Sequence, residues 1–138
     1  TGAPTGRQAA VLTERAFGAG ADAVLVLSPP GVADPRPYYD AVANVMGGYS
    51  ALQQWYRHFM APGVAHCGGG VGPQPQNLFP TVVNWVENGV APDTLLATKS
   101  LPGGVTQSRP LCPYPAMAKY IGSGDTNDAA NFVCSTTP

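Results

Sequence analysis

A histidine next to a cysteine lies in the stretch whose residue types are best suited to catalysis. His66 and Cys67 follow a turn at Pro62-Gly63 and precede residues 68–72, where four of five positions are glycine. A histidine on a loop can take up and return protons, because its ordinary pKa is about 6.5. The glycines leave no side chains in its way and let the backbone approach another surface closely. This stretch predicts acid–base chemistry; the alternative is a structural histidine in a glycine-rich loop.

Alternating helix and strand patterns surround this stretch. In order, they predict a helix over 7–17, a strand over 24–27, a helix over 38–46, a strand over 55–60 and a helix over 78–88. Asn77 is a candidate N-cap of the last helix, and Gly89 is its expected end. The side chains of that helix expected to face inward are Leu78, Val82, Trp85 and Val86. This order is typical of a doubly wound α/β fold, with catalytic loops at the carboxyl ends of parallel strands.

The overall composition excludes several classes of protein. The chain has 138 residues, the size of one domain, of which 44% are hydrophobic and 11% charged. Its net charge of −1 gives no electrostatic basis for binding nucleic acid or an anionic membrane. No apolar run approaches the roughly 20 residues of a membrane-spanning helix. Because the sequence begins at Thr1 without a signal-peptide pattern, we expect a mature or processed product, or a fragment.

The remaining motifs give no basis for a metal site or a cofactor. His66 and Cys67 are adjacent, so they cannot easily converge on one ion, and no second ligand pair is visible. The glycine run lacks the Gly-Lys-Ser/Thr ending of a phosphate loop. The segment 125–128 is no EF-hand, because Thr136 occupies the position that needs glutamate. We expect this segment to form an Asx-type turn that caps a short helix through Phe132. From Pro92 onward we expect mostly turns, and 73–76 as a loop.

Several motifs together resemble the tannase and feruloyl esterase family, a branch of the α/β-hydrolases. The resemblance covers about residues 31–138. The segments that carry it are Met60-Ala-Pro-Gly-Val-Ala-His-Cys-Gly-Gly-Gly, Asn84-Trp-Val-Glu-Asn-Gly-Val-Ala-Pro-Asp, Arg109-Pro-Leu-Cys-Pro-Tyr-Pro and Gly124-Asp-Thr-Asn-Asp-Ala-Ala-Asn-Phe-Val-Cys. It implies an α/β fold in which this chain is the carboxyl-terminal portion of an α/β-hydrolase. Residues 1–92 would belong to the catalytic domain, and 93–138 would form a loop-rich tail closed by a disulfide.

The resemblance also implies roles for individual residues. By motif position, His66 matches the catalytic base and Asp34 matches the carboxylate that orients it. Asp34 precedes His66 in the chain, as the carboxylate does in α/β-hydrolases. Only 35–37 separate Asp34 from the paired tyrosines, a shorter loop than is usual in the family. The alternative for Asp34 is a turn residue before proline.

The cysteine count and the family pattern together predict one internal disulfide. The three cysteines are Cys67, Cys112 and Cys134. An odd count leaves at least one cysteine without an internal partner. The family pattern implies a bond between Cys112 and Cys134. It also implies a bond from Cys67 to a cysteine beside a serine on an upstream part of the enzyme, outside this chain. The alternative for Cys67 is a free buried thiol.

The expected nucleophile is absent from this sequence, since no Gly-x-Ser-x-Gly elbow occurs. The resemblance therefore implies a secreted, extracellular carboxylic ester hydrolase whose serine, oxyanion hole and lid lie outside the chain. The implied substrates are hydroxycinnamoyl esters of plant cell walls or galloyl esters of tannins, and the sequence does not choose between ferulate and gallate. We expect the chain alone to be inactive. The alternative is a catalytically inactive fragment or binding module that keeps the family scaffold.

Overall fold

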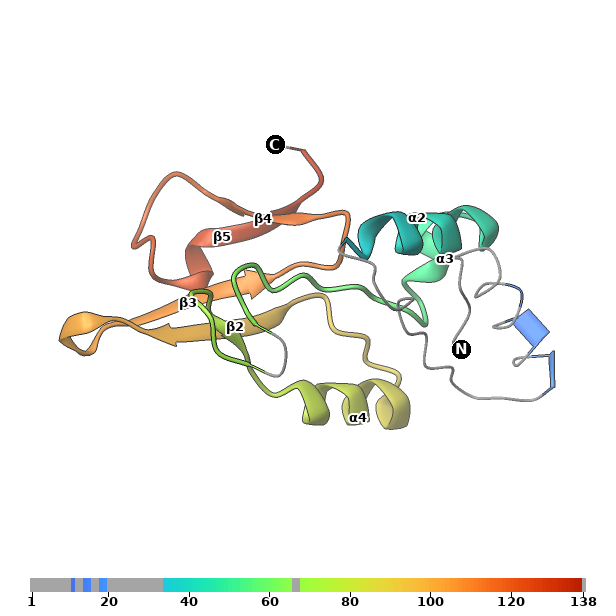
Figure 1. The fold of residues 1–138 in the computed structure, drawn as a ribbon, viewed down its shortest axis with the longest axis horizontal. Coiled ribbons are helices and arrows are strands. Elements are labelled where there is room, and N and C mark those ends of the chain that lie inside the picture. The colour runs from blue at the N-terminus through green and yellow to red at the C-terminus, as the bar shows by residue number, and fades with distance from the viewer. Residues whose placement is uncertain (1–10, 12–13, 16–17, 20–33, 66–67, 138) are drawn as a thin grey trace. The chain divides into compact units, whose positions relative to one another are not determined.

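The computed structural model describes residues 11, 14–15, 18–19, 34–65 and 68–137 (Figure 1). The chain divides into two compact units, residues 1–57 and 58–138. Within the helix expected over 7–17, the described residues Val11, Glu14 and Arg15 are helical. The strand expected over 24–27 lies outside the described residues. The sequence-based division at residue 92 remains a prediction.

Helix α2, Arg36–Val45, organises the described part of the first unit. Its buried side chains recur at helical spacing and are Tyr38, Tyr39, Val42 and Ala43. Gly47 and Gly48 end the helix with φ angles of 90° and 102°, which residues other than glycine rarely adopt. The short helix α3, Tyr49–Leu52, follows directly. The helix expected over 38–46 is thereby confirmed.

A cluster of tyrosines joins α2 to the segment after α3. The Tyr39 hydroxyl donates to the Tyr56 carbonyl oxygen at 2.9 Å, and the two rings meet edge to face with centroids 5.0 Å apart. The Tyr49 hydroxyl donates to Asp40 Oδ1 at 2.6 Å. Burial, and secondarily the neighbouring Tyr38, raises the pKa of Tyr56 above its ordinary value. Tyr56 packs edge to face against Tyr39 as an aromatic anchor.

The strand expected over 55–60 is wrong. The backbone N–H groups of Trp55 and Tyr56 both donate to the Leu52 carbonyl oxygen, at 3.2 and 2.9 Å, in a turn that follows α3. Only Phe59 makes a β contact, an isolated bridge with Pro113. The backbone N–H groups of Trp55 and Tyr56 are therefore used within this turn and are not available for pairing with another strand.

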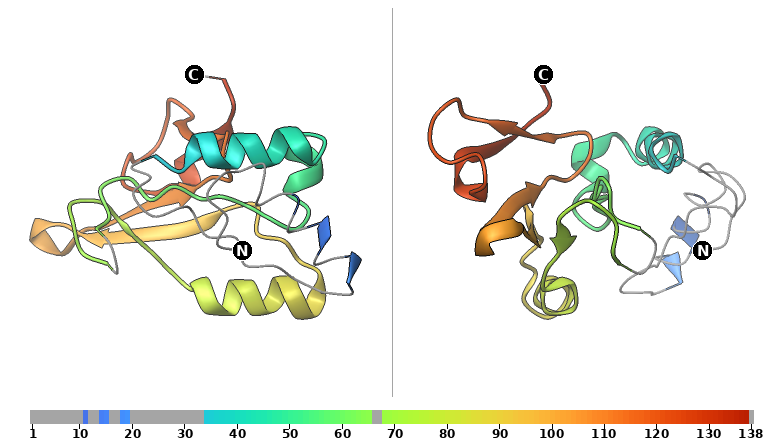
Figure 2. Two further views of the ribbon diagram at one scale, coloured as in Figure 1. Left: turned by 45° about the vertical axis from the view of Figure 1, so that its right-hand side comes forward. Right: turned by 60° about the vertical axis from the view of Figure 1, so that its left-hand side comes forward.

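The second unit contains two antiparallel sheets. The three-stranded sheet has the order β1-β2-β3, and the other pairs β4 with β5. The strands are β1 (Gln74–Pro75), β2 (Leu95–Ser100), β3 (Thr106–Leu111), β4 (Met117–Tyr120) and β5 (Phe132–Ser135). A 3-10 turn, η1 (Pro102–Gly104), connects β2 to β3. Figures 1 and 2 show that α4 (Leu78–Asn88) and the β4–β5 ribbon lie on opposite sides of the β2–β3 hairpin.

The strands after Pro92 correct the expectation that this part of the chain consists mostly of turns. Their residues carry little apolar alternation, and they are formed by pairing: β2 with β3 in a hairpin, and β4 with β5 across a longer connection. The loop expected over 73–76 likewise contains β1, which pairs with β2. All strand pairings among the described residues are antiparallel, so the parallel sheet expected of a doubly wound fold is not represented there.

The helix expected over 78–88 is confirmed as α4. Gly89 ends it in the left-handed conformation, with φ of 69°. Asn77 occupies the N-cap position, but its side chain makes no capping hydrogen bond. Its carbonyl oxygen instead accepts from the backbone N–H and the hydroxyl of Thr81, at 3.1 and 2.8 Å.

The inward orientation expected for α4 is wrong for three of its four residues. Leu78, Val82 and Val86 are 49%, 56% and 68% exposed, and only Trp85 is half-buried. The apolar stripe therefore exists, but no described element of this chain buries it.

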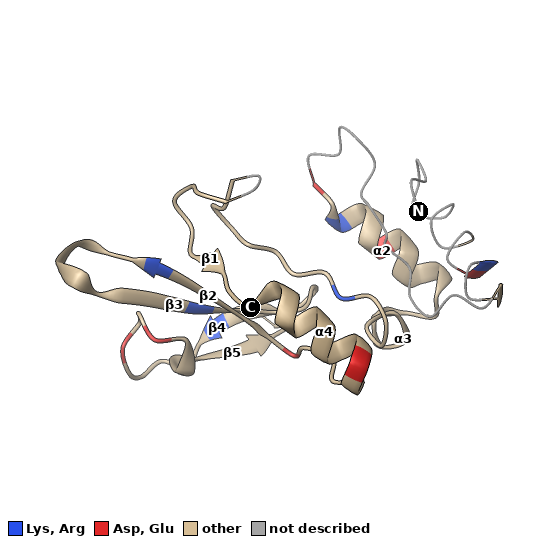
Figure 3. Ribbon diagram, turned by 90° about the horizontal axis from the view of Figure 1, so that it is seen from below, with Lys and Arg blue, Asp and Glu red and all other residues tan. Residues whose placement is uncertain are grey.

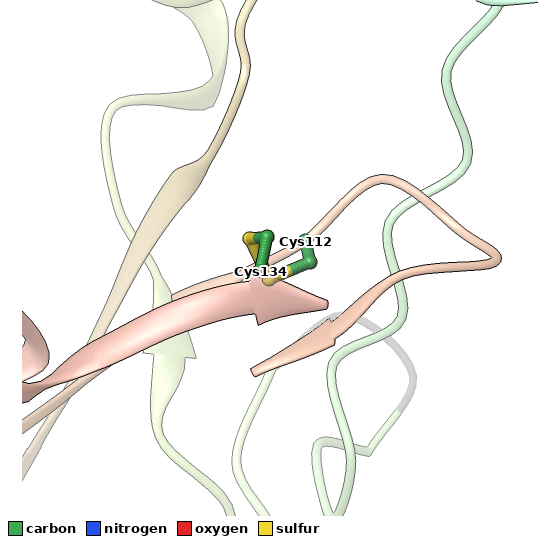
Figure 4. Close-up of a disulfide and its surroundings, with 2 residues drawn as sticks. All are labelled: Cys112 and Cys134. Carbon is green, nitrogen blue, oxygen red and sulfur yellow. A yellow bond between two sulfur atoms is a disulfide. The ribbon is translucent and has the colours of Figure 1, made fainter. Parts of the chain in front are cut away.

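A disulfide joins Cys112, just after β3, to Cys134 in β5 (Figure 4). The bond confirms the expected pairing and links the two sheets. The intervening segment forms the expected Asx turn, in which Asp125 Oδ1 accepts from the Asn127 N–H at 2.8 Å. A 3-10 turn, η2 (Ala129–Asn131), follows, and Asp128 caps it by accepting from the Ala130 N–H.

Charged residues are few and dispersed over separate elements. Figure 3 shows single basic positions in β2, β3 and β4 and an acidic position towards the end of α4. None of the helices in the described part of the chain combines the length and the apolar character that crossing a membrane requires.

We expect the disulfide to contribute much of the stability of the second unit. It closes a loop over a sequence separation of 22 residues. Loss of a cross-link of that span lowers the free energy of unfolding by about 3 kcal/mol in the chain-entropy model. Denaturant unfolding of the Cys112→Ala/Cys134→Ala variant should show this loss, with the wild type under reducing and non-reducing conditions as the matched comparison. Equal midpoints in all three samples would contradict the expectation.

Candidate active site

The glycine-rich stretch folds back on the segment before it. The Ala65 N–H donates to the Gly69 carbonyl oxygen at 3.0 Å, and the Gly72 N–H donates to that of Gly63 at 2.8 Å. Val64 and Gly70 form an antiparallel bridge between these two contacts. The backbone of 63–65 thus runs beside that of 69–72. We call this paired segment, residues 63–72, the histidine loop, after the His66 within it.

Two of the glycines are needed because these backbones approach so closely. A Cβ atom on Gly70 would collide with the Gly63 carbonyl oxygen, and one on Gly72 would collide with the Pro62 carbonyl oxygen. Gly70 also has a φ of 91°. The sequence-based expectation of a close backbone approach is therefore confirmed, and the approaching surface is the preceding segment of the same chain.

His66 and Cys67 lie outside the described residues. Their immediate neighbours are described, and the Gly68 N–H donates to the Ala65 carbonyl oxygen at 3.0 Å. The two chain ends that lead into and out of the His66–Cys67 pair are therefore tied to each other. The roles of His66 and Cys67 remain predictions from the motif.

Two side chains that the sequence did not single out anchor the histidine loop. Gln74 Nε2 donates to the carbonyl oxygens of Gly69 and Gly72, at 2.8 and 3.2 Å. Lys99 Nζ, from β2, donates to the Val71 carbonyl oxygen at 2.7 Å. No periodicity or motif marks these contacts, because each depends on a backbone carbonyl oxygen that folding brings within reach.

Asp34 forms a local ion pair just before α2. Its carboxylate accepts from Arg36 Nε at 2.8 and 3.1 Å, from the Arg36 terminal nitrogen at 2.7 Å, and from the Arg36 backbone N–H at 3.0 Å. The Asp34 side chain is 43% exposed. Asp34 belongs to the first unit and His66 to the second, so their pairing remains a prediction.

None of the serines in the described part of the chain lies at a turn from a strand into an α-helix. Ser108 in β3 already makes structural contacts, since its hydroxyl accepts from the Ala129 N–H at 2.8 Å. The other described serines are Ser50 in α3, Ser100 in β2, Ser123 in a turn and Ser135 in β5. Ser28 lies outside the described residues. The structure therefore offers no nucleophile elbow among the serines that it describes.

The described residues contain no group of three or more His, Cys, Asp or Glu side chains arranged to hold a metal ion. The acidic side chains of 125–128 have structural contacts instead: Asp125 closes the Asx turn and Asp128 caps η2.

Comparison with known proteins identifies the class to which this scaffold belongs. The crystal structure of an esterase from Aspergillus oryzae superimposes on 75% of this chain and 24% of that chain, with a TM-score of 0.66 and 30% identity. A mono(2-hydroxyethyl) terephthalate hydrolase of Piscinibacter sakaiensis is 43% identical over 108 residues, 76% of this chain and 17% of that protein. A probable feruloyl esterase of Arthroderma benhamiae is 45% identical over 102 residues, 71% of this chain and 19% of that protein.

These similarities define an α/β fold of the α/β-hydrolase type, of which this chain represents a part. The family model described as tannase and feruloyl esterase matches residues 27–135, so the chain belongs to the tannase and feruloyl esterase family. It spans 17% and 19% of the length of the two curated relatives named above.

The close backbone approach predicts that Gly72→Ala destabilises the fold. The new methyl group would overlap the Pro62 carbonyl oxygen, and overpacking of this kind typically costs about 1–3 kcal/mol. Gly18→Ala is a matched control, because nothing lies within 4 Å of its added Cβ. Equilibrium unfolding should show a loss for Gly72→Ala and none for Gly18→Ala. Equal stability of the two variants would refute the steric argument.

Proposed function

We propose that this chain is the carboxyl-terminal part of a carboxylic ester hydrolase and carries its general base. His66 takes the proton from a serine hydroxyl as that oxygen attacks the ester carbonyl, and it then gives the proton to the departing alcohol. In the second half of the reaction, His66 activates water to release the acid. The observation that supports this role is the family motif around His66 within an anchored backbone hairpin.

Asp34 is the proposed orienting carboxylate. It would accept from the imidazole N–H of His66 and hold the tautomer that accepts a proton from the serine. In the proposed arrangement Asp34 would keep its ion pair with Arg36. Arg36 would then hold the carboxylate in place while it faces the histidine.

The serine, the oxyanion hole and the lid are proposed to come from polypeptide outside this chain. Two observations support this proposal: the chain spans 17% and 19% of two relatives, and no described serine lies at an elbow into an α-helix. The exposed apolar stripe of α4 is consistent with further polypeptide packing on it. Cys67 would form a disulfide with a cysteine beside that serine and so tie the two loops together.

The proposed substrates are esters of aromatic carboxylic acids. The names of the relatives include a feruloyl esterase and a terephthalate ester hydrolase. Hydroxycinnamoyl esters of plant cell walls and galloyl esters of tannins are the classes that the family resemblance implies. Secretion to an extracellular, oxidising environment is proposed because it suits the Cys112–Cys134 disulfide.

The alternative is a catalytically inactive fragment or a binding module that keeps the family scaffold. The small share of the relatives that the chain spans favours this alternative as well. Intact mass of the native sample, before and after reduction, separates the two. A second chain released by reduction supports the processed enzyme, and a single unchanged chain supports the alternative.

The general-base role predicts that His66→Ala abolishes most of the turnover of the complete enzyme. Loss of a triad member should lower kcat by about 10⁴-fold or more and change KM far less. Hydrolysis of methyl ferulate and methyl gallate measures both constants. The 138-residue chain alone should show no turnover above background, since the serine and the oxyanion hole are proposed to lie outside it. Near-normal kcat in His66→Ala would remove His66 from the mechanism.

The orienting role predicts a contrast between two neighbouring substitutions. Asp34→Asn should lower kcat by about 10⁴-fold, because an amide favours the wrong imidazole tautomer. Arg36→Met breaks the ion pair but keeps the carboxylate, and an exposed pair of this kind contributes about 0–1 kcal/mol. Its kcat should therefore fall by less than about fivefold. Similar losses in both variants would assign Asp34 a structural role in the turn before α2.

A further inference from the structure

The carboxamide of Gln74 links the sheet of the second unit to the histidine loop. Its Nε2 carries two N–H donors, and the two carbonyl oxygens of Gly69 and Gly72 lie 2.8 and 3.2 Å away. A single side chain thus binds two backbone carbonyl groups of the loop, three positions apart. Both acceptors are backbone atoms of residues that have no side chain to pack.

The contact with Gly69 continues towards His66. The Gly69 carbonyl oxygen also accepts from the Ala65 N–H at 3.0 Å, and Ala65 immediately precedes His66 in the sequence. The Ala65 carbonyl oxygen in turn accepts from the Gly68 N–H at 3.0 Å. A continuous series of hydrogen bonds therefore runs from Gln74 through Gly69 to the residue on each side of the His66–Cys67 pair.

Gln74 is itself held by the sheet. It pairs with Thr98 of β2, and the next residue, Pro75, pairs with Ala97, which is fully buried. The Gln76 N–H donates to the Leu96 carbonyl oxygen at 2.8 Å. The side chain that donates to the loop therefore extends from β1, and β1 pairs with the buried residue Ala97 of β2.

The described residues of the histidine loop offer little apolar surface for packing. Four of the five residues from 68 to 72 are glycine, and Val71 is 80% exposed. Glycine loses more conformational freedom on folding than any other residue, and here it offers no apolar surface in return. Among the described residues, the position of the loop depends on backbone hydrogen bonds and on the side chains of Gln74 and Lys99, which donate to it.

We propose that Gln74 is a positioning residue of this esterase, which holds the histidine loop so that His66 stays in its productive place. The inference rests on the proposed role of His66 as general base. Lys99 supports the same loop through a single acceptor, the Val71 carbonyl oxygen, whereas Gln74 donates to two, so we expect the contribution of Lys99 to be smaller. Misplacement of a catalytic group by about 1 Å can cost about 100-fold in rate, so a loop anchor can affect kcat without touching the substrate.

The test compares Gln74→Ala with Gln107→Ala in the complete enzyme. The control also removes one donated carboxamide hydrogen bond, from Gln107 Nε2 to Asn127 Oδ1 at 3.1 Å, whose acceptor belongs to the same unit but not to the histidine loop. For Gln74→Ala we expect kcat on methyl ferulate or methyl gallate to fall by about 10- to 100-fold, with KM within about twofold. Hydrogen exchange of the peptide 61–73 should accelerate in Gln74→Ala and stay unchanged in Gln107→Ala.

Two further variants test whether misfolding, rather than loss of the contact with the loop, explains a lower kcat. Gln74→Glu keeps the shape but places a carboxylate, which only accepts hydrogen bonds, against two carbonyl oxygens, so its kcat should fall at least as far. Lys99→Met removes the single contact with Val71 and should fold normally, with a loss of kcat smaller than that of Gln74→Ala and faster exchange in the same peptide.

The outcomes separate this inference from the function on which it rests. If His66→Ala abolishes turnover but Gln74→Ala keeps normal kcat or normal loop exchange, the positioning role is overturned. An equal loss in Gln107→Ala would also overturn it, because the effect would not be specific to the loop. If His66→Ala leaves turnover unchanged, the proposed function itself fails, and the catalytic role of Gln74 fails with it.

Discussion

The antiparallel pairing of β2 with β3 supports much of the second unit. Its six residue pairs run from Leu95 opposite Leu111 to Ser100 opposite Thr106. Among its described residues the unit has few buried apolar side chains, including Ala97 in β2 and Leu111 in β3. Because so little apolar surface is buried there, the backbone hydrogen bonds of this ladder and the contacts attached to it fix the arrangement of the other segments. One edge of the ladder leads to the histidine loop and the other to the disulfide.

The β2 side and the β3 side of this strand pair hold different segments of the second unit. On the β2 side, β1 and Lys99 hold the histidine loop, whose own glycines contribute almost no packing. On the β3 side, the chain continues to Cys112, whose bond to Cys134 secures β5. Ser108 of β3 further binds the loop before β5, since its N–H donates to the Asn127 carbonyl oxygen at 2.7 Å. Loss of the ladder would release the candidate catalytic loop and the carboxyl-terminal ribbon together.

The apolar stripe of α4 is exposed in a chain that covers only part of the structures of its relatives. A helix with Leu78, Val82 and Val86 on one face normally packs on a neighbouring layer, yet here all three are exposed. The chain covers only 24% of the esterase structure that it resembles. Two independent features, an uncovered helix and a loop with a candidate base but no described nucleophile elbow, thus support the same proposal of an enzyme completed by other polypeptide.

The sequence alone predicted the features that depend on neighbouring residues or on the motifs of the family. The family motifs led to the correct family and to the Cys112–Cys134 bond, the helix over 78–88 ended at Gly89 as expected, and the glycine run did mark a close backbone approach. Only the tertiary structure decided which segments pair: the strands after Pro92, the absence of a strand at 55–60 and the exposure of α4. It also revealed the anchoring by Gln74 and Lys99, the latter 28 positions from its acceptor. Helix propensity and the conformational freedom of glycine depend on residues close together in the sequence. Strand pairing and hydrogen bonds from side chains to the backbone depend on partners that come together only when the chain folds.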